Sequence, residues 1–144
     1  MKTAILLAAL VLPLLAAHAL AKSLTSAQVG EIFCDARLSG DMAPVMAILT
    51  PELAAIIQKA APAGVDLATA VPWQSSSDYA NQCQAVGAQG TFDSPELVIA
   101  FGYDDASKAG YADSLVMRFV DERLRIDDVK YTNGGTLREK LAGK

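Results

Sequence analysis

The hydrophobic period of the chain changes close to Cys83, and this change constrains the fold more than any other feature of the sequence. Before it, apolar residues recur every three or four positions, and after it they alternate with a period of two. The first pattern is typical of amphipathic helices and the second of half-buried strands. The sequence therefore predicts an α+β domain in which N-terminal helices pack on an antiparallel sheet of about four strands.

Three helices are expected in the first half. A capping box at Thr25 and Gln28 opens a helix over 26–38. Asp41 is expected to cap a short second helix, and Thr50 followed by a proline begins a third. Apolar stripes along these helices predict core packing rather than a cofactor groove, and they comprise Val29, Ile32, Phe33, Ala36, Met42, Val45, Met46, Leu49, Leu53, Ile56, Ile57 and Ala60.

Residues 62–82 form a long connection without clear periodicity. A connection of this length in a small domain is either functional or partly mobile. It contains Trp73 and Tyr79, whose rings either line a ligand-binding mouth or fold back over the edge of the core. Both interpretations stay open, and the two aromatic residues are candidate ligand contacts.

The second half predicts strands near 84–90, 97–103, 115–120 and 124–131, with a polar hairpin loop over 104–110. Acidic residues near that loop suggest calcium, but they lack the spacing and the closing Glu of an EF-hand loop. We interpret them as solvated loop charge and predict no metal site; they are Asp104, Asp105 and Asp113. The residues expected to face the helices are Leu97, Ile99, Phe101, Tyr103, Leu115, Met117 and Phe119.

The acidic pair Asp127 and Asp128 interrupts the last strand. Leu124 and Ile126 share a face with Val129 and Tyr131 only if the alternation slips by one residue at the pair. One extra residue in a strand is a β-bulge, so we interpret the pair as structural. Because bulges also occur beside active sites, Asp128 and Tyr131 are retained as candidate ligand contacts.

The chain is expected to end in a short helix. It follows a turn at Asn133-Gly134-Gly135, and Thr136 with Glu139 forms a second capping box. Leu137 and Leu141 are the apolar residues by which this helix is predicted to dock.

Residues 1–21 have the pattern of a secretory signal peptide. A positive Lys2 precedes an apolar stretch too short for a membrane span of about 20 residues, and Ala19-Leu20-Ala21 is a cleavage site of the small-x-small type. Cleavage after Ala21 is expected, with cleavage after Ala19 as the alternative. The mature domain, 22–144, is then periplasmic or secreted and is not held in the membrane.

Export bears on the two cysteines, Cys34 and Cys83. Thiols in an oxidising compartment persist as disulfides, so we predict that they are bonded to one another. The alternative, a nucleophilic cysteine with a histidine base, is excluded because the one histidine of the chain is His18, within the signal peptide. The chain has 12 basic and 16 acidic side chains, which argues against nucleic acid as a partner.

One face of the predicted sheet is more apolar than a fully solvated face usually is. We expect it to bind a partner weakly or to form a weak homodimer. The alternative is that the valines of this face reflect only the high strand propensity of valine and bind no partner. The residues of this face are Val98, Ala100, Val116, Arg118 and Val120.

The segment RIDDVKY followed by GGTLREKL, within 123–141, resembles a family of bacterial exported proteins, domain of unknown function 3828. Phe33-Cys34 and Asp41 also agree with it. The family is similar to the cystatin-like cone of nuclear transport factor two, which implies helices against a curved antiparallel sheet. In such cones a Gly and a Trp commonly open the last strand, whereas this chain has Glu122 and Leu124 at those places. The family has no assigned activity, so the resemblance transfers no catalytic residue.

These observations favour a non-enzymatic exported domain that binds an unidentified protein or small molecule and uses no cofactor. A first alternative is a small enzyme with a cone pocket, in which Asp127 or Asp128 acts as general base and Tyr131 donates a hydrogen bond. A second alternative is an inhibitor or immunity-type protein directed against another secreted protein.

Overall fold

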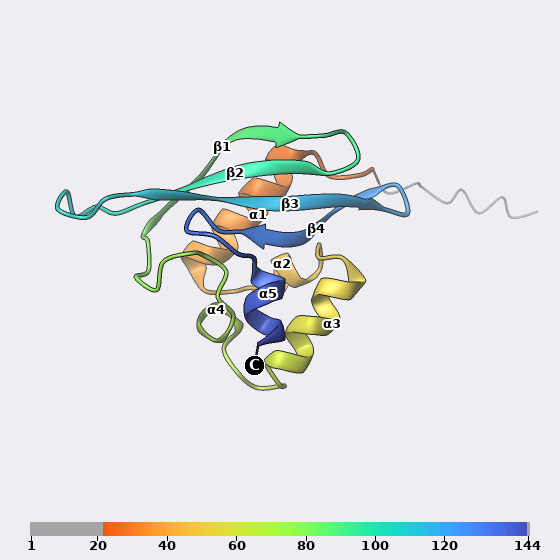
Figure 1. The fold of residues 1–144 in the computed structure, drawn as a ribbon, viewed down its shortest axis with the longest axis horizontal. Coiled ribbons are helices and arrows are strands. Elements are labelled where there is room, and N and C mark those ends of the chain that lie inside the picture. The colour runs from red at the N-terminus through yellow and green to blue at the C-terminus, as the bar shows by residue number, and fades with distance from the viewer. Residues whose placement is uncertain (1–21, 144) are drawn as a thin grey trace, which may run out of the picture.

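The computed structural model describes residues 22–143, so the predicted signal peptide lies outside the described residues. The described chain is an α+β domain with a four-stranded antiparallel sheet (Figure 1). Its elements are α1 (Ser26–Ser39), α2 (Ala43–Met46), α3 (Pro51–Ala60), α4 (Leu67–Ala70), β1 (Gln82–Gly90), β2 (Pro95–Gly102), β3 (Tyr111–Val120), β4 (Arg123–Lys130) and α5 (Leu137–Ala142).

The strands follow one another in the spatial order β1-β2-β3-β4, each pairing with its neighbour in the chain. Helix α1 lies behind the sheet in Figure 1, where it packs mainly on β1, and α3, α4 and α5 lie beyond the β4 edge. The segment before α3 covers that edge, because the Thr50 amide donates to the Ile126 carbonyl at 2.8 Å and the Ile126 amide donates to the Ile48 carbonyl at 2.9 Å. The helical half of the chain is therefore hydrogen-bonded to the sheet at the β4 edge. The opposite edge strand, β1, pairs only with β2.

The predicted helix signals are confirmed at α1, α3 and α5. Capping boxes open α1 at Thr25 and α5 at Thr136, and the Thr50 hydroxyl accepts the Leu53 amide at the start of α3. Gly40 ends α1 in the left-handed conformation with φ of 81°, which glycine adopts without steric cost.

Two details of the helical half differ from expectation. Met42, rather than Asp41, is the residue preceding α2, although the Asp41 carboxylate still accepts the Ala43 amide at 3.0 Å. The connection over 62–82 contains α4, whose start is capped by Asp66 accepting the Ala68 amide at 3.0 Å. A single turn is too short to produce a helical period, so the sequence pattern did not indicate it.

The core lies between α1, the sheet and the helices at the β4 edge. Leu97, Ile99, Phe101, Leu115 and Met117 are buried there, as the alternation predicts. Phe119 is a correction to that prediction, since 43% of its surface is exposed. It is the second-last residue of β3, and its ring stacks on Phe92 at a centroid distance of 5.9 Å instead of packing under a helix.

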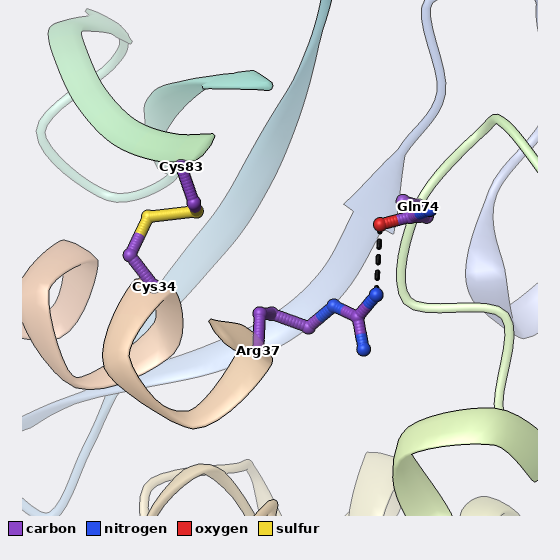
Figure 2. The surroundings of a disulfide bond; sticks show 4 residues. All are labelled: Cys34, Arg37, Gln74 and Cys83. Atoms are coloured by element: carbon purple, nitrogen blue, oxygen red, sulfur yellow. Dashed lines mark hydrogen bonds between the residues drawn. A yellow bond between two sulfur atoms is a disulfide. The ribbon is translucent and has the colours of Figure 1, made fainter. Parts of the chain in front are cut away.

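The disulfide between Cys34 and Cys83 is present, with the Cα atoms 5.3 Å apart. It joins the middle of α1 to the second residue of β1, as Figure 2 shows. The predicted bond is therefore confirmed, and it ties the helical half of the chain to the start of the sheet.

The bulge in β4 is also confirmed. Val116 pairs with Asp128 and Met117 pairs with Ile126, so Asp127 is the extra residue. The slip keeps the apolar residues on both sides of the pair in the core, where Ile126 and Val129 are fully buried. A second register shift, between Ala85 and Gly87 in β1, was not predicted from the sequence.

Candidate ligand-binding cleft

The acidic pair of β4 is engaged in contacts that hold the fold together. The Asp127 carboxylate accepts the Arg138 guanidinium at 2.6 Å and the Thr50 hydroxyl at 2.9 Å. The Asp128 carboxylate has different partners, the backbone amides of Val129 at 2.8 Å and Arg138 at 3.0 Å. Asp127 therefore connects β4 to the starts of α3 and α5, and Asp128 binds an amide in the first turn of α5 in addition to the Thr136 cap.

Tyr131 does not join this pair. Its side chain is buried, and its hydroxyl donates to the carbonyl of Pro72. Burial raises the pKa of the Tyr131 phenol, and the negative charges of Asp128 and Asp113 raise it further. The general-base arrangement considered from the sequence is therefore not assembled in the described residues, because Asp127, Asp128 and Tyr131 each serve a different contact.

A cleft of about 350 Å³ lies between the end of α1, α4 and the chain that follows α4. We call it the Arg37 cleft. Its walls comprise Arg37, Thr69, Val71, Pro72, Trp73, Gln74, Ser75, Ser76, Ser77, Tyr79 and Lys140. It contains two cationic side chains and no carboxylate among its lining residues, and it is bordered by the loop that the sequence singled out.

Arg37 lines this cleft, and Figure 2 shows its guanidinium directed toward the Gln74 side chain. It lies in the last turn of α1, and only 7% of its surface is exposed. Its guanidinium donates to the Gln74 side-chain carbonyl at 2.8 Å and to the Ala68 backbone carbonyl at 3.2 Å. The guanidinium carbon lies 4.8 Å from the centre of the Tyr79 ring, which covers it as a cation–π contact. All of these partners are neutral.

Gln74 is also buried and fixed by hydrogen bonds. Its side chain is 6% exposed, and its amide nitrogen donates to the backbone carbonyls of Ser76 and Asp78, each at 3.0 Å. The loop therefore curls around the Gln74 side chain, and the carbonyl oxygen of that side chain is directed toward Arg37. The guanidinium is fixed in position by a preorganised acceptor rather than by an ion pair.

The two aromatic candidates of the loop have different roles. Trp73 is 1% exposed, packs edge-on against Phe33 and donates its ring N–H to the Leu67 carbonyl at 2.8 Å. It forms the floor of the cleft and part of the core. Tyr79 is 48% exposed at the mouth of the cleft, and its hydroxyl donates to the carbonyl of Ala68. Trp73 therefore has the core role considered from the sequence, whereas Tyr79 as a ligand contact stays a prediction.

Asp113 anchors the 62–82 connection to β3. This corrects the expectation that Asp113 is a solvated loop charge. It lies in β3 and is 3% exposed, and its carboxylate accepts the Ser75 amide at 2.7 Å and the Thr132 amide at 2.9 Å. The alternation places residue 113 on the inward face of β3 with Leu115, which is the signal that indicates its burial. Asp104 and Asp105 are exposed in the hairpin loop, as expected.

Sequence reasoning missed Arg37, Gln74 and Lys140 as members of this cleft. Arg37 follows Val29 and Phe33 at intervals of four, so it lies on the buried face of α1, and that spacing was the available signal. Lys140 comes from α5 and its ammonium lies 4.4 Å from the centre of the Tyr131 ring. Neither Asp128 nor Tyr131 lines the cleft, although Tyr131 contacts two of the lining residues, Pro72 and Lys140.

The residues predicted to form an interaction face differ in their exposure. Val98, Ala100, Val116 and Val120 are half-buried, and Arg118 is exposed. The Arg118 guanidinium lies 2.9 Å from Glu52 and 3.5 Å from Asp127, so its charge is paired across the β4 edge. The hydrogen bond that Glu52 accepts from its own backbone at the start of α3 lowers its pKa, and Arg118 lowers it further.

No protein-family model, no curated protein and no solved structure matches the chain. Among residues 22–143 no three His, Cys, Asp or Glu side chains are grouped in a way that could hold a metal ion. Within the same part of the chain, none of the helices has the length and apolar character needed to cross a bilayer.

Proposed function

We propose that the chain is an exported, non-enzymatic binding domain and that the Arg37 cleft is its ligand site. The observation that carries the proposal is the buried guanidinium of Arg37, which lines an open cleft and is fixed by Gln74 and Tyr79. Fixed polar groups in a concave site are the usual basis of ligand recognition, because they lose little entropy when a ligand binds.

The non-enzymatic part of the proposal is supported by the contacts of the acidic pair. A general base needs a carboxylate that reaches the substrate. The Asp127 carboxylate is held by Arg138 and Thr50, and the Asp128 carboxylate is held by two backbone amides. Releasing either would weaken the attachment of α5 to the sheet.

Export and the finer fold are parts of the same proposal. The signal-like pattern of residues 1–21 and the bond between Cys34 and Cys83 favour a periplasmic or secreted location. We propose that the α+β domain is a cystatin-like cone related to nuclear transport factor two and to domain of unknown function 3828. The order of helices before a four-stranded antiparallel meander supports this relationship.

A fragment screen followed by NMR tests the ligand site. Residues 22–144 are labelled with ¹⁵N, assigned, and mixed with a library of small neutral and charged fragments. We expect saturable shifts to cluster at Thr69, Gln74, Ser76 and Tyr79. Hits that cluster instead at the amides around Asp127 would support the enzyme alternative, and hits on the outer face of the sheet would support a partner-binding role for that face.

A weak homodimer through the outer face is proposed as a second mode of interaction. Its support is the half-buried stripe of Val98, Ala100 and Val116 across β2 and β3. Sedimentation at increasing concentration measures the self-association of the wild type, and Val116→Asp is expected to abolish it while the monomer stays folded. A wild type that remains monomeric at millimolar concentration would exclude this mode.

A further inference from the structure

We propose that the Arg37 cleft binds the oxyanion end of a small organic molecule, a carboxylate or a phosphate group. This inference rests on the proposed function, because it names the chemical class of the ligand for the same cleft. It starts from the charge of Arg37, which has no counter-ion in the described part of the chain.

The guanidinium of Arg37 is a buried charge whose hydrogen-bonding capacity is mostly unused. An arginine has five N–H donors, and the structure gives acceptors for two of them, on Ala68 and Gln74. The Nε atom is buried and has no hydrogen-bond partner. A buried charge is costly unless it is paired, so a guanidinium held among neutral acceptors has unsatisfied affinity for an anion.

Two local features reduce this cost without removing the charge. Arg37 lies in the last turn of α1, where the helix dipole favours a cation, and the Tyr79 ring covers the guanidinium at 4.8 Å. Asp113, a buried carboxylate behind the same loop, is engaged with the amides of Ser75 and Thr132. The net positive charge of the cleft therefore remains available to a ligand.

The rest of the lining agrees with an anionic ligand. Lys140 contributes a second positive charge from α5, and three consecutive serines, 75–77, are also among the lining residues. No carboxylate lines the cleft, so nothing in it repels an anion. A guanidinium donates two parallel hydrogen bonds to carboxylate or phosphate oxygens, which is the chemistry these two groups share. A volume of about 350 Å³ suits the anion together with a small organic body.

The test compares matched anions and neutral analogues at constant ionic strength. Acetate and benzoate, inorganic phosphate and phenyl phosphate, and the neutral acetamide and benzamide are each titrated into residues 22–144. Sodium chloride keeps the ionic strength equal, so that a general salt effect is removed. The readouts are isothermal calorimetry and the ¹⁵N shift of the Arg37 Nε–H group. If Arg37 had only a structural role, adding an anion would leave that shift unchanged.

We expect at least one anion to bind with Kd below about 1 mM and to shift the Arg37 Nε signal, while its neutral analogue binds at least about tenfold more weakly. The relative affinity of benzoate and phenyl phosphate then tells a carboxylate ligand from a phosphate ligand.

Three variants locate the binding. Arg37→Lys retains the charge but loses the planar fork, and it is expected to weaken anion binding at least about tenfold. Lys140→Gln, at the exposed end of α5, is expected to weaken binding about threefold without affecting the fold. Lys59→Gln removes the same charge from α3, outside the cleft, and is expected to leave the affinity unchanged. Circular dichroism confirms that each variant is folded before it is titrated.

The outcomes separate this inference from the proposed function. If benzamide binds the cleft as tightly as benzoate, the cleft is a ligand site but the oxyanion inference is wrong. If anions bind equally well to the wild type, Arg37→Lys and Lys140→Gln, binding occurs elsewhere and the inference is also wrong. If neither anions nor the fragment library shift the residues of the cleft, both proposals fail.

Discussion

Gly30 of α1 lies against Ala85 of β1 so closely that a Cβ atom placed on Gly30 would be 2.7 Å from the Cβ of Ala85 and 2.8 Å from a methyl group of Leu97. The first contact is with an atom fixed directly to the backbone, which cannot move aside as the end of a long side chain can. The absence of a side chain at position 30 thus sets how near α1 approaches the sheet.

Gly30→Ala is therefore expected to destabilise the protein. Alanine would add about 1 kcal/mol of helix propensity, but the clash with the sheet should cost about 1–3 kcal/mol, so the clash dominates. Urea unfolding followed by circular dichroism measures the difference. Gly87→Ala is the control, because a Cβ there meets nothing within 4 Å. An increase in stability for Gly30→Ala would show that α1 moves freely on the sheet.

The disulfide is expected to contribute substantially to stability. It links residues separated by 49 positions in the sequence, and closing a loop of that length should lower the free energy of the folded state relative to the unfolded chain by about 4 kcal/mol. The double variant Cys34→Ala, Cys83→Ala is expected to lose an amount of this order in urea unfolding. Thiol labelling of the denatured, unreduced wild type should detect no free thiol, and two labelled cysteines would contradict the bond.

The fold was more predictable from the sequence than the site was, and the reason is the range of the interactions. Capping boxes, the alternation in β2 and β3 and the slip at Asp127 are local patterns, and the structure agrees with each of them. The bulge at Asp127 was recognisable because the alternation of apolar and polar residues in β4 resumes one position late. One extra residue in the strand explains this shift and keeps the apolar residues on the same face.

The Arg37 cleft depends on contacts between distant segments. Arg37 is buried because the chain after α4 folds across the end of α1 and places Gln74 against it, 37 positions later in the sequence. No local pattern around Arg37 reports that contact. Phe119 illustrates the opposite case, because it continues the inward alternation of β3 but is 43% exposed near the end of the strand, where it stacks on Phe92.

Substitutions in the acidic bulge are expected to affect stability and not ligand binding. Asp127→Ala removes acceptors for Arg138 and Thr50 and should cost about 1–2 kcal/mol. Asp128→Ala removes the acceptor for the Arg138 amide in the first turn of α5 and should cost about 1 kcal/mol, although the Thr136 cap remains. Asp93→Ala, in the exposed turn between β1 and β2, is the control and should change stability by less than about 0.5 kcal/mol.

The same variants distinguish the binding domain from the enzyme alternative. If Asp127→Ala and Asp128→Ala remain folded and bind the ligand of the Arg37 cleft with unchanged affinity, their role is structural. A variant that is as stable as the wild type but loses binding would place the acidic pair in the site. Calorimetric titration of each variant with a ligand identified by the fragment screen provides this comparison.

Two tyrosines, the half-buried Tyr111 and the buried Tyr131, are expected to make the protein sensitive to alkaline pH. Burial raises the pKa of both Tyr111 and Tyr131 above the ordinary value of 10.0. Below that pH, both the folded and the unfolded chain hold the phenol protons, so the two groups do not change the stability with pH. Above it, the unfolded chain releases protons that the folded chain retains, and the free energy of unfolding therefore falls as the pH rises.

The two tyrosines should differ at neutral pH, which allows their contributions to be separated. The Tyr111 hydroxyl is buried without a hydrogen-bond partner, so Tyr111→Phe is expected to be neutral or to stabilise the protein by up to about 1 kcal/mol. Tyr131→Phe leaves the Pro72 carbonyl without its donor and should cost about 1 kcal/mol. Each variant should nevertheless lose stability less steeply than the wild type between about pH 10 and pH 11.5. Urea unfolding at fixed steps of pH measures the slope, and a variant as steep as the wild type would show that the tyrosine it lacks ionises equally in both states.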